Sequence, residues 1–343
     1  MIPENEFEKL TSSPPPGSLQ WEEEPEDTLT DEEISLSLSP DDWFFLIQTL
    51  KSGLCTPFLG AGASSMTLRT GADIAREWAK KHNYPMEDSD DLPKVAQFMA
   101  VKYRTARLPK TLMAQIVSAA SHPSAVSPYD PHTALAELEL PLYITTNYDN
   151  FMTKALQVRK GEKQVQVEIL RWNNGLSNLK SVFDDPNFSL TPERPLVYHL
   201  HGNADNWQSL VLTESDYIDF LVNTAASREL VPPVIRGAIA GTSLLFLGYR
   251  LADLNFRVLF QAICGSLEDS VGEAHISVQL PPFTRKLTKD QRKARIEYLN
   301  GYFSKLNVKV FWGNCETFVK TLRQKQAEYS GNVQASAATG LNH

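Results

Sequence analysis

Four short polar motifs follow apolar runs in this sequence, and their residues could bind a phosphate-bearing ligand and perform chemistry on it. In chain order they are Gly-Ala-Gly-Ala-Ser at 60–64, Thr-Thr-Asn-Tyr-Asp at 145–149, His-Gly-Asn-Ala-Asp at 201–205 and Gly-Tyr-Arg-Leu-Ala-Asp at 248–253. Each motif is therefore expected where a strand ends and a loop begins. In an open α/β sheet, ligands bind in the crevice at the carboxyl ends of the strands. Together the motifs predict a nucleotide site with catalytic groups beside it.

The glycine motif at 60–64 has the context of a turn that holds a phosphate. Glycine lets the backbone approach an anion, and N–H groups at the start of a following helix complement its charge. The motif lacks the third glycine of the dehydrogenase fingerprint, and no Gly-Lys-Ser/Thr of a P-loop follows it. Taken alone, it is equally compatible with a tight turn that binds no ligand.

The second motif places three hydrogen-bonding side chains directly after an apolar strand, where unpartnered polar groups are costly. Asn147 can both donate and accept, so it could hold a ribose hydroxyl and a water together. Asp149 could anchor the loop, hold the carboxamide end of a nicotinamide indirectly, or only cap the helix that follows.

The third motif supplies a candidate general base. His199 and His201 are two residues apart on a predicted strand and are expected to share one face, but no third metal ligand stands out. Gly202 indicates a loop that leaves the His201 imidazole exposed at the strand tip, where it could act as a base near neutral pH. We interpret His199 as structural. In the fourth motif, Asp253 and Arg257 are four apart on a predicted helix, and a structural ion pair accounts for them.

The elements that must position these motifs alternate along the chain. A helix is predicted from Pro40, with Ser39 as its N-cap and Asp42 completing a capping box, to Gly53. This alternation predicts an α/β fold with a Rossmann-like, doubly wound, mostly parallel sheet. Strands are predicted at 54–59, 142–145, 165–170, 196–200, 244–247, 276–280 and 308–311. Further helices are predicted at 72–81, 93–103, 111–120, 133–138, 215–222, 233–240, 253–264, 289–299 and 316–325.

Charge divides the chain into a tail and a body. Of its 41 acidic and 33 basic residues, residues 1–42 contain thirteen acidic residues and one basic residue, so the body is nearly neutral and predicts no direct nucleic-acid binding. We expect a disordered acidic tail at 1–38, one catalytic domain at 39–328 with a helical insertion at about 72–125, and a flexible C-terminus at 329–343.

The cysteines and the hydropathy of the sequence indicate where in the cell the protein is found. The three cysteines lie far apart, which excludes a zinc ribbon or a dithiol motif and suits a reducing cytoplasm. The sequence has no signal-peptide pattern and no run of about 18 apolar residues, so we expect a cytoplasmic protein without a membrane span.

In type and order, the four motifs together resemble those of the sirtuin-like superfamily, and specifically its bacterial antiphage-defence branch, which hydrolyses NAD. The resemblance covers about residues 43–325 and includes Leu-Thr-Glu-Ser-Asp-Tyr at 212–217. It implies that Asn147 positions a water and that His201 is the catalytic histidine acting on the ribose. The cofactor-binding residues that it implies are Gly60, Ala61, Gly62 and Ser64 at the phosphates, Thr146, Asp149 near the nicotinamide end, and Gly248 and Tyr249 on the adenosine side.

Departures from the family favour water, and not an acylated protein, as the acceptor of the ADP-ribosyl group. Deacylating sirtuins carry a four-cysteine zinc module, whereas this chain has no cysteine between Cys55 and Cys264, and no acyl-lysine groove motif is recognisable. The resemblance therefore implies a metal-free NAD+ hydrolase that releases nicotinamide and ADP-ribose and serves antiviral defence, as in abortive infection, by NAD depletion. It also implies a homo-oligomer and a separate regulatory partner such as a HerA-type ATPase. Two alternatives are an NAD-dependent protein deacylase or ADP-ribosyltransferase, and a non-catalytic sensor of NAD or ADP-ribose.

Overall fold

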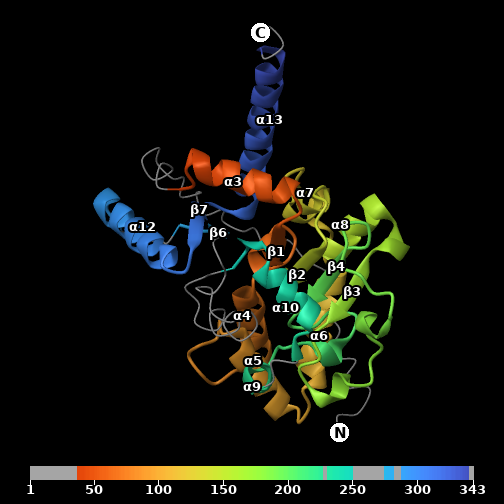
Figure 1. The fold of residues 1–343 in the computed structure, drawn as a ribbon. Helices are drawn as coiled ribbons and strands as arrows, with labels where there is room; N and C mark the ends of the chain where they lie inside the picture. Colours follow the sequence, from red (N-terminus) through yellow and green to blue (C-terminus); the bar gives the residue numbers. More distant parts are fainter. Residues whose placement is uncertain (1–36, 227–229, 250–273, 282–286, 340–343) are drawn as a thin grey trace.

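The computed structural model describes residues 37–226, 230–249, 274–281 and 287–339 (Figure 1). Within these ranges the core is a seven-stranded sheet in the order β3-β4-β2-β1-β5-β6-β7, and every pairing is parallel. This confirms the predicted doubly wound α/β fold. The strands are β1 (Cys55–Leu59), β2 (Leu142–Thr145), β3 (Gln166–Ile169), β4 (Leu196–His199), β5 (Ser243–Leu247), β6 (His275–Gln279) and β7 (Val308–Trp312).

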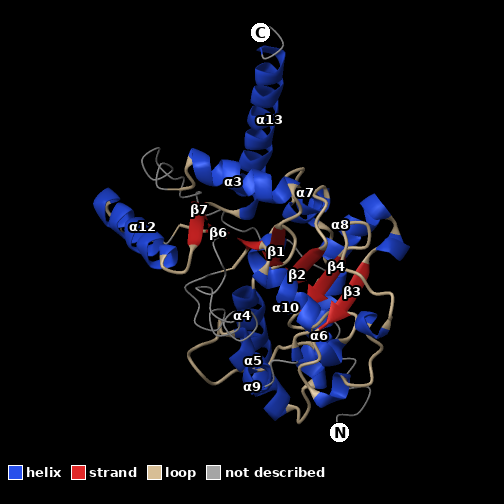
Figure 2. Ribbon diagram, viewed as in Figure 1, coloured by secondary structure: helices blue, strands red, loops and turns tan. Residues whose placement is uncertain are grey.

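Helices cover both faces of this sheet (Figure 2). Alternate strand residues face opposite sides, so Phe58 belongs to the core on one face and Leu59 to the core on the other. The Leu59 face is covered by α3 (Pro40–Lys51), α7 (Pro131–Ala136), α8 (Phe151–Lys160) and α13 (Cys315–Thr339). The Phe58 face is covered by α9 (Glu214–Ala226), α10 (Pro233–Ala240) and α12 (Lys289–Ser304).

The predicted helical insertion forms a unit with its own apolar core. Between β1 and β2 lie α4 (Gly71–His82), α5 (Leu92–Lys102) and α6 (Arg107–Ala119). Their buried residues pack together and also against Ala204, Leu210 and Leu212, which follow β4. The insertion is therefore attached directly to the loop that carries the third motif.

Helix ends agree with the predicted capping at the start of the body, whereas α6, α9, α12 and α13 are each longer than predicted. Ser39 and Asp42 form the capping box of α3. The helix α6 begins four residues earlier than predicted, because Pro109 lies within its first turn, where proline is tolerated. The helix α13 continues beyond the predicted end at residue 325, and Tyr329 extends its contact with α3 by donating a hydrogen bond to the Pro40 carbonyl at 2.9 Å.

Some predictions concern residues that the structure does not describe. Most of the predicted acidic tail lies in 1–36, and the predicted helix at 253–264, with Asp253 and Arg257, lies in 250–273. Among the helices in the described ranges, none combines the length and apolarity needed to cross a membrane.

Candidate active site

The first motif meets Gly248 and Tyr249, the described residues of the fourth motif, at the point where the strand order reverses. From β1 the chain continues to β2 on one side, and after β4 it crosses to β5 on the other side, so the loops after β1 and β5 border the switch point. The Gly60 N–H donates to the Leu247 carbonyl at 2.8 Å, and the Gly62 N–H donates to the Gly248 carbonyl at 3.0 Å. Backbone hydrogen bonds thus join the two loops.

Glycine is required here because backbone packs directly on backbone. Gly248 has φ +77°, and a Cβ on it would lie 2.2 Å from the Ala63 nitrogen. A Cβ on Gly62 would lie 2.8 Å from the Gly248 Cα. Close packing therefore accounts for these glycines, while Ala61 and Gly62 remain exposed on the outer side of the loop.

The glycine motif continues into a short 3₁₀ turn, Ala61–Ser64, and the helix predicted at 72–81 is confirmed as α4, which begins at Gly71. No α-helix begins at the glycine motif. The N–H groups of a helix start, which were expected to complement the charge of a phosphate there, are therefore absent from this position.

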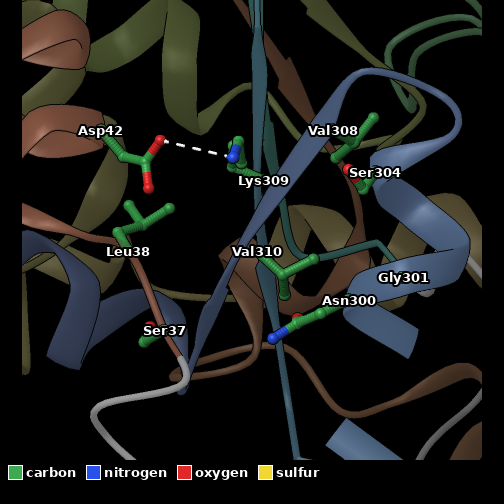
Figure 3. Close-up of a pocket in the computed structure, with 9 residues that line it drawn as sticks. All are labelled: Ser37, Leu38, Asp42, Asn300, Gly301, Ser304, Val308, Lys309 and Val310. Atoms are coloured by element: carbon green, nitrogen blue, oxygen red, sulfur yellow. Dashed lines mark ion pairs between the residues drawn. The ribbon is translucent and has the colours of Figure 1, made fainter. Parts of the chain in front are cut away.

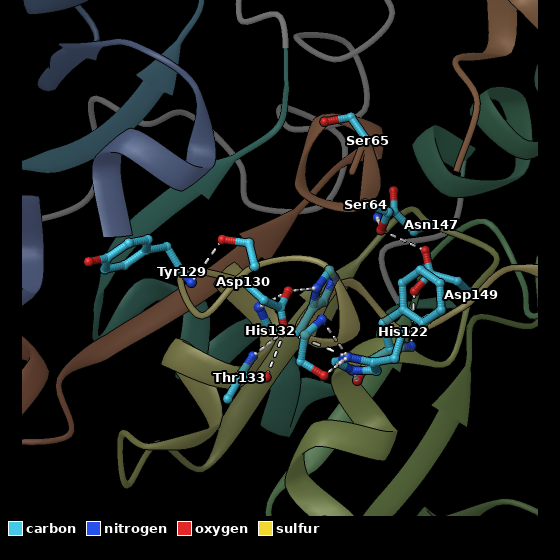
Figure 4. Close-up of polar contacts among 12 residues, drawn as sticks. Ser64, Ser65, His122, Tyr129, Asp130, His132, Thr133, Asn147 and Asp149 are labelled. Carbon is cyan, nitrogen blue, oxygen red and sulfur yellow. Dashed lines mark hydrogen bonds and ion pairs between the residues drawn. The ribbon is translucent and has the colours of Figure 1, made fainter. Parts of the chain in front are cut away.

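Four predicted site residues form one buried hydrogen-bonded network, and Figure 4 labels three of them, Ser64, Asn147 and Asp149. The Asn147 amide nitrogen lies 3.0 Å from the Gly60 carbonyl and 3.0 Å from the Ser64 hydroxyl, and Ser64 donates to Asp149 Oδ2 at 2.8 Å. Because the Gly60 carbonyl can only accept, the NH₂ group of Asn147 must face it, which fixes the amide orientation. The Asn147 Oδ1 accepts no hydrogen bond from the described part of the chain, so it is the group left to a ligand or a water.

Both carboxylate oxygens of Asp149 accept hydrogen bonds from neighbouring loop and helix residues. Its Oδ1 accepts from the Phe151 N–H at 3.0 Å, at the first residue of α8, and its Oδ2 is held by Ser64. The helix-capping interpretation of Asp149 therefore describes one of its contacts, and anchoring of Asn147 through Ser64 describes the other.

Thr146 and Tyr249 close the network around the end of β1. The Tyr249 hydroxyl donates to the Leu59 carbonyl at 2.8 Å, and the Thr146 hydroxyl lies 2.8 Å from the Tyr249 oxygen. Burial raises the pKa of the Tyr249 phenol well above its ordinary value, so this donor keeps its proton. Thr146 therefore donates to Tyr249, and residues after β1, β2 and β5 are linked at one carbonyl.

The two histidines of the third motif have different environments. The His199 Nδ1 donates to the Asn147 carbonyl at 3.2 Å, and its Nε2 accepts from the Asn203 amide at 3.2 Å. Burial lowers the pKa of His199, which is consistent with the neutral tautomer that these contacts require. His199 is therefore a satisfied structural residue.

His201 lies beyond the end of β4, so the predicted sharing of one strand face with His199 is wrong. Its ring contacts Phe220 and Tyr217 edge-on, with centroids 4.9 and 5.5 Å apart, and no hydrogen bond to its ring nitrogens is present within the described residues. His201 is buried, so the predicted exposure of its imidazole at the strand tip is wrong. Burial lowers the pKa of His201 to about 3, so its imidazole is neutral at physiological pH. No direct contact joins His201 to Asn147, although their strands are neighbours with Thr145 opposite His199.

Comparison with known protein families agrees with the motifs of the sequence. Residues 141–310 match the family described as the SIR2-like domain. The chain carries a SIR2-like domain. This confirms the resemblance to the sirtuin-like family that the motifs indicated.

Two curated relatives of this SIR2-like chain have the name NAD(+) hydrolase ThsA. The protein from Enterococcus faecium is 29% identical over 132 residues, which are 38% of this chain and 24% of the relative. The protein from Cytobacillus dafuensis is 25% identical over 208 residues, which are 60% of this chain and 37% of the relative. The chain thus matches only about a quarter to a third of the lengths of these relatives.

Contacts between the loops after β2 and β4 hold the candidate site together, and the sequence motifs did not predict these pairings. Asn150 donates to Asp205 at 2.8 Å, and Tyr148 donates to the Val211 carbonyl at 2.5 Å, so the loops after β2 and β4 are tied together. Gly202 has φ +84°, and a Cβ on it would lie 2.2 Å from the Ser209 carbonyl oxygen. The partners of Asn150 and Tyr148 are remote in sequence, so spacing alone could not identify these two contacts.

A second polar cluster lies on the chain just before the matched residues (Figure 4). Asp130 is fully buried and accepts hydrogen bonds from His132 Nδ1 at 2.9 Å and from the Thr133 hydroxyl at 2.7 Å. Burial alone would raise the pKa of Asp130, but the hydrogen bonds and charge of these partners outweigh it and lower the pKa to about 2. His122 lies 3.0 Å from the Phe151 carbonyl, so this cluster supports the first turn of α8.

The described residues also include a pocket of 320 Å³ that lies apart from the predicted site (Figure 3). It is bordered by the start of β7 and the end of α12, three strands away from β1. In this pocket Lys309 and Asp42 form an ion pair at 3.9 Å. None of the predicted site residues lines it. No group of three or more potential metal ligands occurs within the part of the chain that the structure describes.

Proposed function

We propose that this chain is an NAD+ hydrolase that cleaves the nicotinamide–ribose bond and releases nicotinamide and ADP-ribose. The observation that carries the proposal is the fixed Asn147 amide, which keeps its carbonyl oxygen for a ligand beside the glycine loop at the switch point. The name NAD(+) hydrolase of both ThsA relatives supports the same reaction. Asn147 and His201 are the proposed catalytic residues.

The proposed reaction depends mainly on how the substrate and the attacking water are positioned. Nicotinamide leaves as a neutral molecule from a cationic ring, so it needs no strong general acid, and the ribose passes through an oxocarbenium-like state as in glycoside hydrolysis. Holding the reactants in the right geometry can lower such a barrier by about 7–11 kcal/mol. We assign the diphosphate to the exposed side of the loop at Ala61 and Gly62, and the adenosine side to Gly248 and Tyr249.

Asn147 and His201 would act on the water and the ribose. The Asn147 Oδ1 accepts a hydrogen bond from the attacking water, while the amide group stays held by Gly60 and Ser64. A neutral His201 can accept a proton from a ribose hydroxyl or from the water. Because a base with a pKa of about 3 is weak, we expect its contribution near the lower end of the usual range of about 10²–10⁴-fold.

Asp149 acts indirectly in this proposal. Its two carboxylate oxygens accept from Ser64 and from the Phe151 N–H, so Asp149 holds the Asn147 loop in place. Thr146 acts in the same way through the Tyr249 hydroxyl.

The test uses the purified full chain with NAD+ and follows nicotinamide by chromatography. We expect release by the wild type, about a 100-fold or greater loss in Asn147→Ala, and about a 100-fold loss in His201→Ala. The exposed Asn187 serves as a matched control, since Asn187→Ala removes an amide outside the network. A modified protein without free ADP-ribose would instead favour transfer, and tight NAD+ binding without turnover would favour a sensor.

The cellular role follows from the resemblance of the motifs. We propose that the activity serves antiphage defence by depleting NAD, because loss of this cofactor stops the metabolism of an infected cell. A homo-oligomer, a HerA-type ATPase partner and a cytoplasmic location remain predictions, and co-purification of the chain from its own host tests the first two.

A further inference from the structure

A buried ion pair joins the helical insertion to α9. The Lys110 Nζ lies 2.8 Å from Asp216 Oδ1, and the two side chains are only 7% and 12% exposed. Burying two charges is costly, and such a pair seldom adds stability over well-packed apolar residues. Stability alone therefore does not account for this pair.

The Asp216 carboxylate organises the start of α9. Its Oδ2 accepts from the Thr213 N–H at 2.8 Å and from the Leu212 N–H at 3.2 Å. The next residue, Tyr217, and Phe220 one turn later are the rings that contact His201. The position of Asp216 thus determines where the aromatic wall of His201 lies.

Lys110 also lies near a second structure that borders the His201 turn. Its Nζ lies 5.4 Å from the centroid of the Trp172 ring, and the Trp172 indole donates to the Ser209 carbonyl at 2.8 Å. That carbonyl packs directly against Gly202, the residue after His201. One ammonium group therefore pairs with Asp216 at the start of α9 and lies near the Trp172 ring, which is bound to the residue beside Gly202.

We propose that Lys110 and Asp216 are positioning residues for His201, through which the insertion sets the orientation of the catalytic imidazole. Because no residue in the described ranges hydrogen-bonds the imidazole, ring packing against Tyr217 and Phe220 sets its orientation. A shift of α9 therefore moves the imidazole. The catalytic part of this inference rests on the proposed NAD+ hydrolysis, whereas the structural part does not.

The test compares Lys110→Met with Lys94→Met. Lys94 forms an ion pair with Asp88 at 2.7 Å within the insertion, and neither residue contacts α9 through that pair. We expect Lys110→Met to lower kcat for nicotinamide release about 10–100-fold, since a displacement of about 1 Å has an effect of this size. KM should stay within about two-fold of wild type, because binding contacts are unchanged. Lys94→Met should change neither constant.

A second readout is independent of hydrolysis. The His201 imidazole C–H signals in NMR lie in the ring-current field of Phe220 and Tyr217, and His201→Gln assigns them. We expect these signals to shift in Lys110→Met at a temperature where circular dichroism shows a folded protein, and to stay in place in Lys94→Met. If wild type releases no nicotinamide, the proposed function fails, and the NMR comparison still decides the positioning role.

Possible misfolding is covered by the double variant Lys110→Met/Asp216→Leu, which removes both charges and keeps apolar volume. We expect it to fold and still to show the shifted His201 signal and the low kcat, because the Thr213 and Leu212 amides have lost their acceptor. An unmoved His201 signal, wild-type kcat in the double variant, or an equal loss of kcat in Lys94→Met would overturn the inference.

Discussion

Gly248→Ala tests whether close contact between the loops after β1 and β5 builds the proposed active site. The new Cβ would lie 2.2 Å from the Ala63 nitrogen and 2.8 Å from the Gly60 carbonyl oxygen, both of them backbone atoms that cannot rotate away. Reaching an ordinary contact requires the loops to separate by about 1 Å, a displacement that can lower a rate about 100-fold. Asn147 would move with them, because its amide is bound to the Gly60 carbonyl. We therefore expect kcat for nicotinamide release to fall about 100-fold.

Gly161→Ala is the matched control for backbone strain. Gly161 also has a positive φ, +88°, but a Cβ on it meets no atom within 4 Å. Each substitution carries a conformational penalty of about 1–3 kcal/mol, and only Gly248→Ala adds the clash. Nicotinamide release and thermal unfolding of both variants separate strain from displacement. Activity of Gly248→Ala within two-fold of wild type, or an equal loss in Gly161→Ala, would refute the reasoning.

Two further predictions concern the buried polar groups of the site. Ser64→Ala removes a hydrogen bond to a carboxylate, so it should lower the free energy of unfolding by about 2 kcal/mol and kcat about ten-fold. Denaturant unfolding and nicotinamide release measure these effects, with the exposed Ser177→Ala as the control. Unchanged kcat in Ser64→Ala would contradict the role of Ser64 in holding Asn147. Burial lowers the pKa of His201 from 6.5 to about 3, so its contribution to stability is complete above pH 6.5 and is lost as the pH falls toward 3. The unfolded chain binds one more proton in this window, which gives a slope of up to about 1.4 kcal/mol per pH unit. His201→Gln should flatten the pH dependence of unfolding by that amount, and equal slopes in variant and wild type would show that the ring is not buried as described.

Local signals predicted the strands and most helices well. The apolar run after Pro141 predicted β2 with the bounds that the structure has, and Ser39 with Asp42 predicted the start of α3. The start of α6 was predicted too late, because its first turn has no side-chain cap to mark it. Periodicity therefore located elements where a capping or turn residue bounded them.

The contacts of the site depend on residues that are remote in sequence. Asn147 was identifiable from its motif, but its orientation depends on Gly60, 87 residues earlier. Lys110 has the same appearance in sequence as any solvated lysine on a helix, and its partner Asp216 is 106 residues away. Hydrogen-bond partners at such separations are set by the tertiary fold, which no local pattern encodes.

The backbone contact between Gly62 and Gly248 also limits how the proposed NAD+ site can be redesigned. Where main chain meets main chain there is no side chain to shorten, so no second substitution can relieve a bulkier residue at either position. Attempts to alter nucleotide preference should leave both glycines alone and vary the outward-facing Ala61 instead.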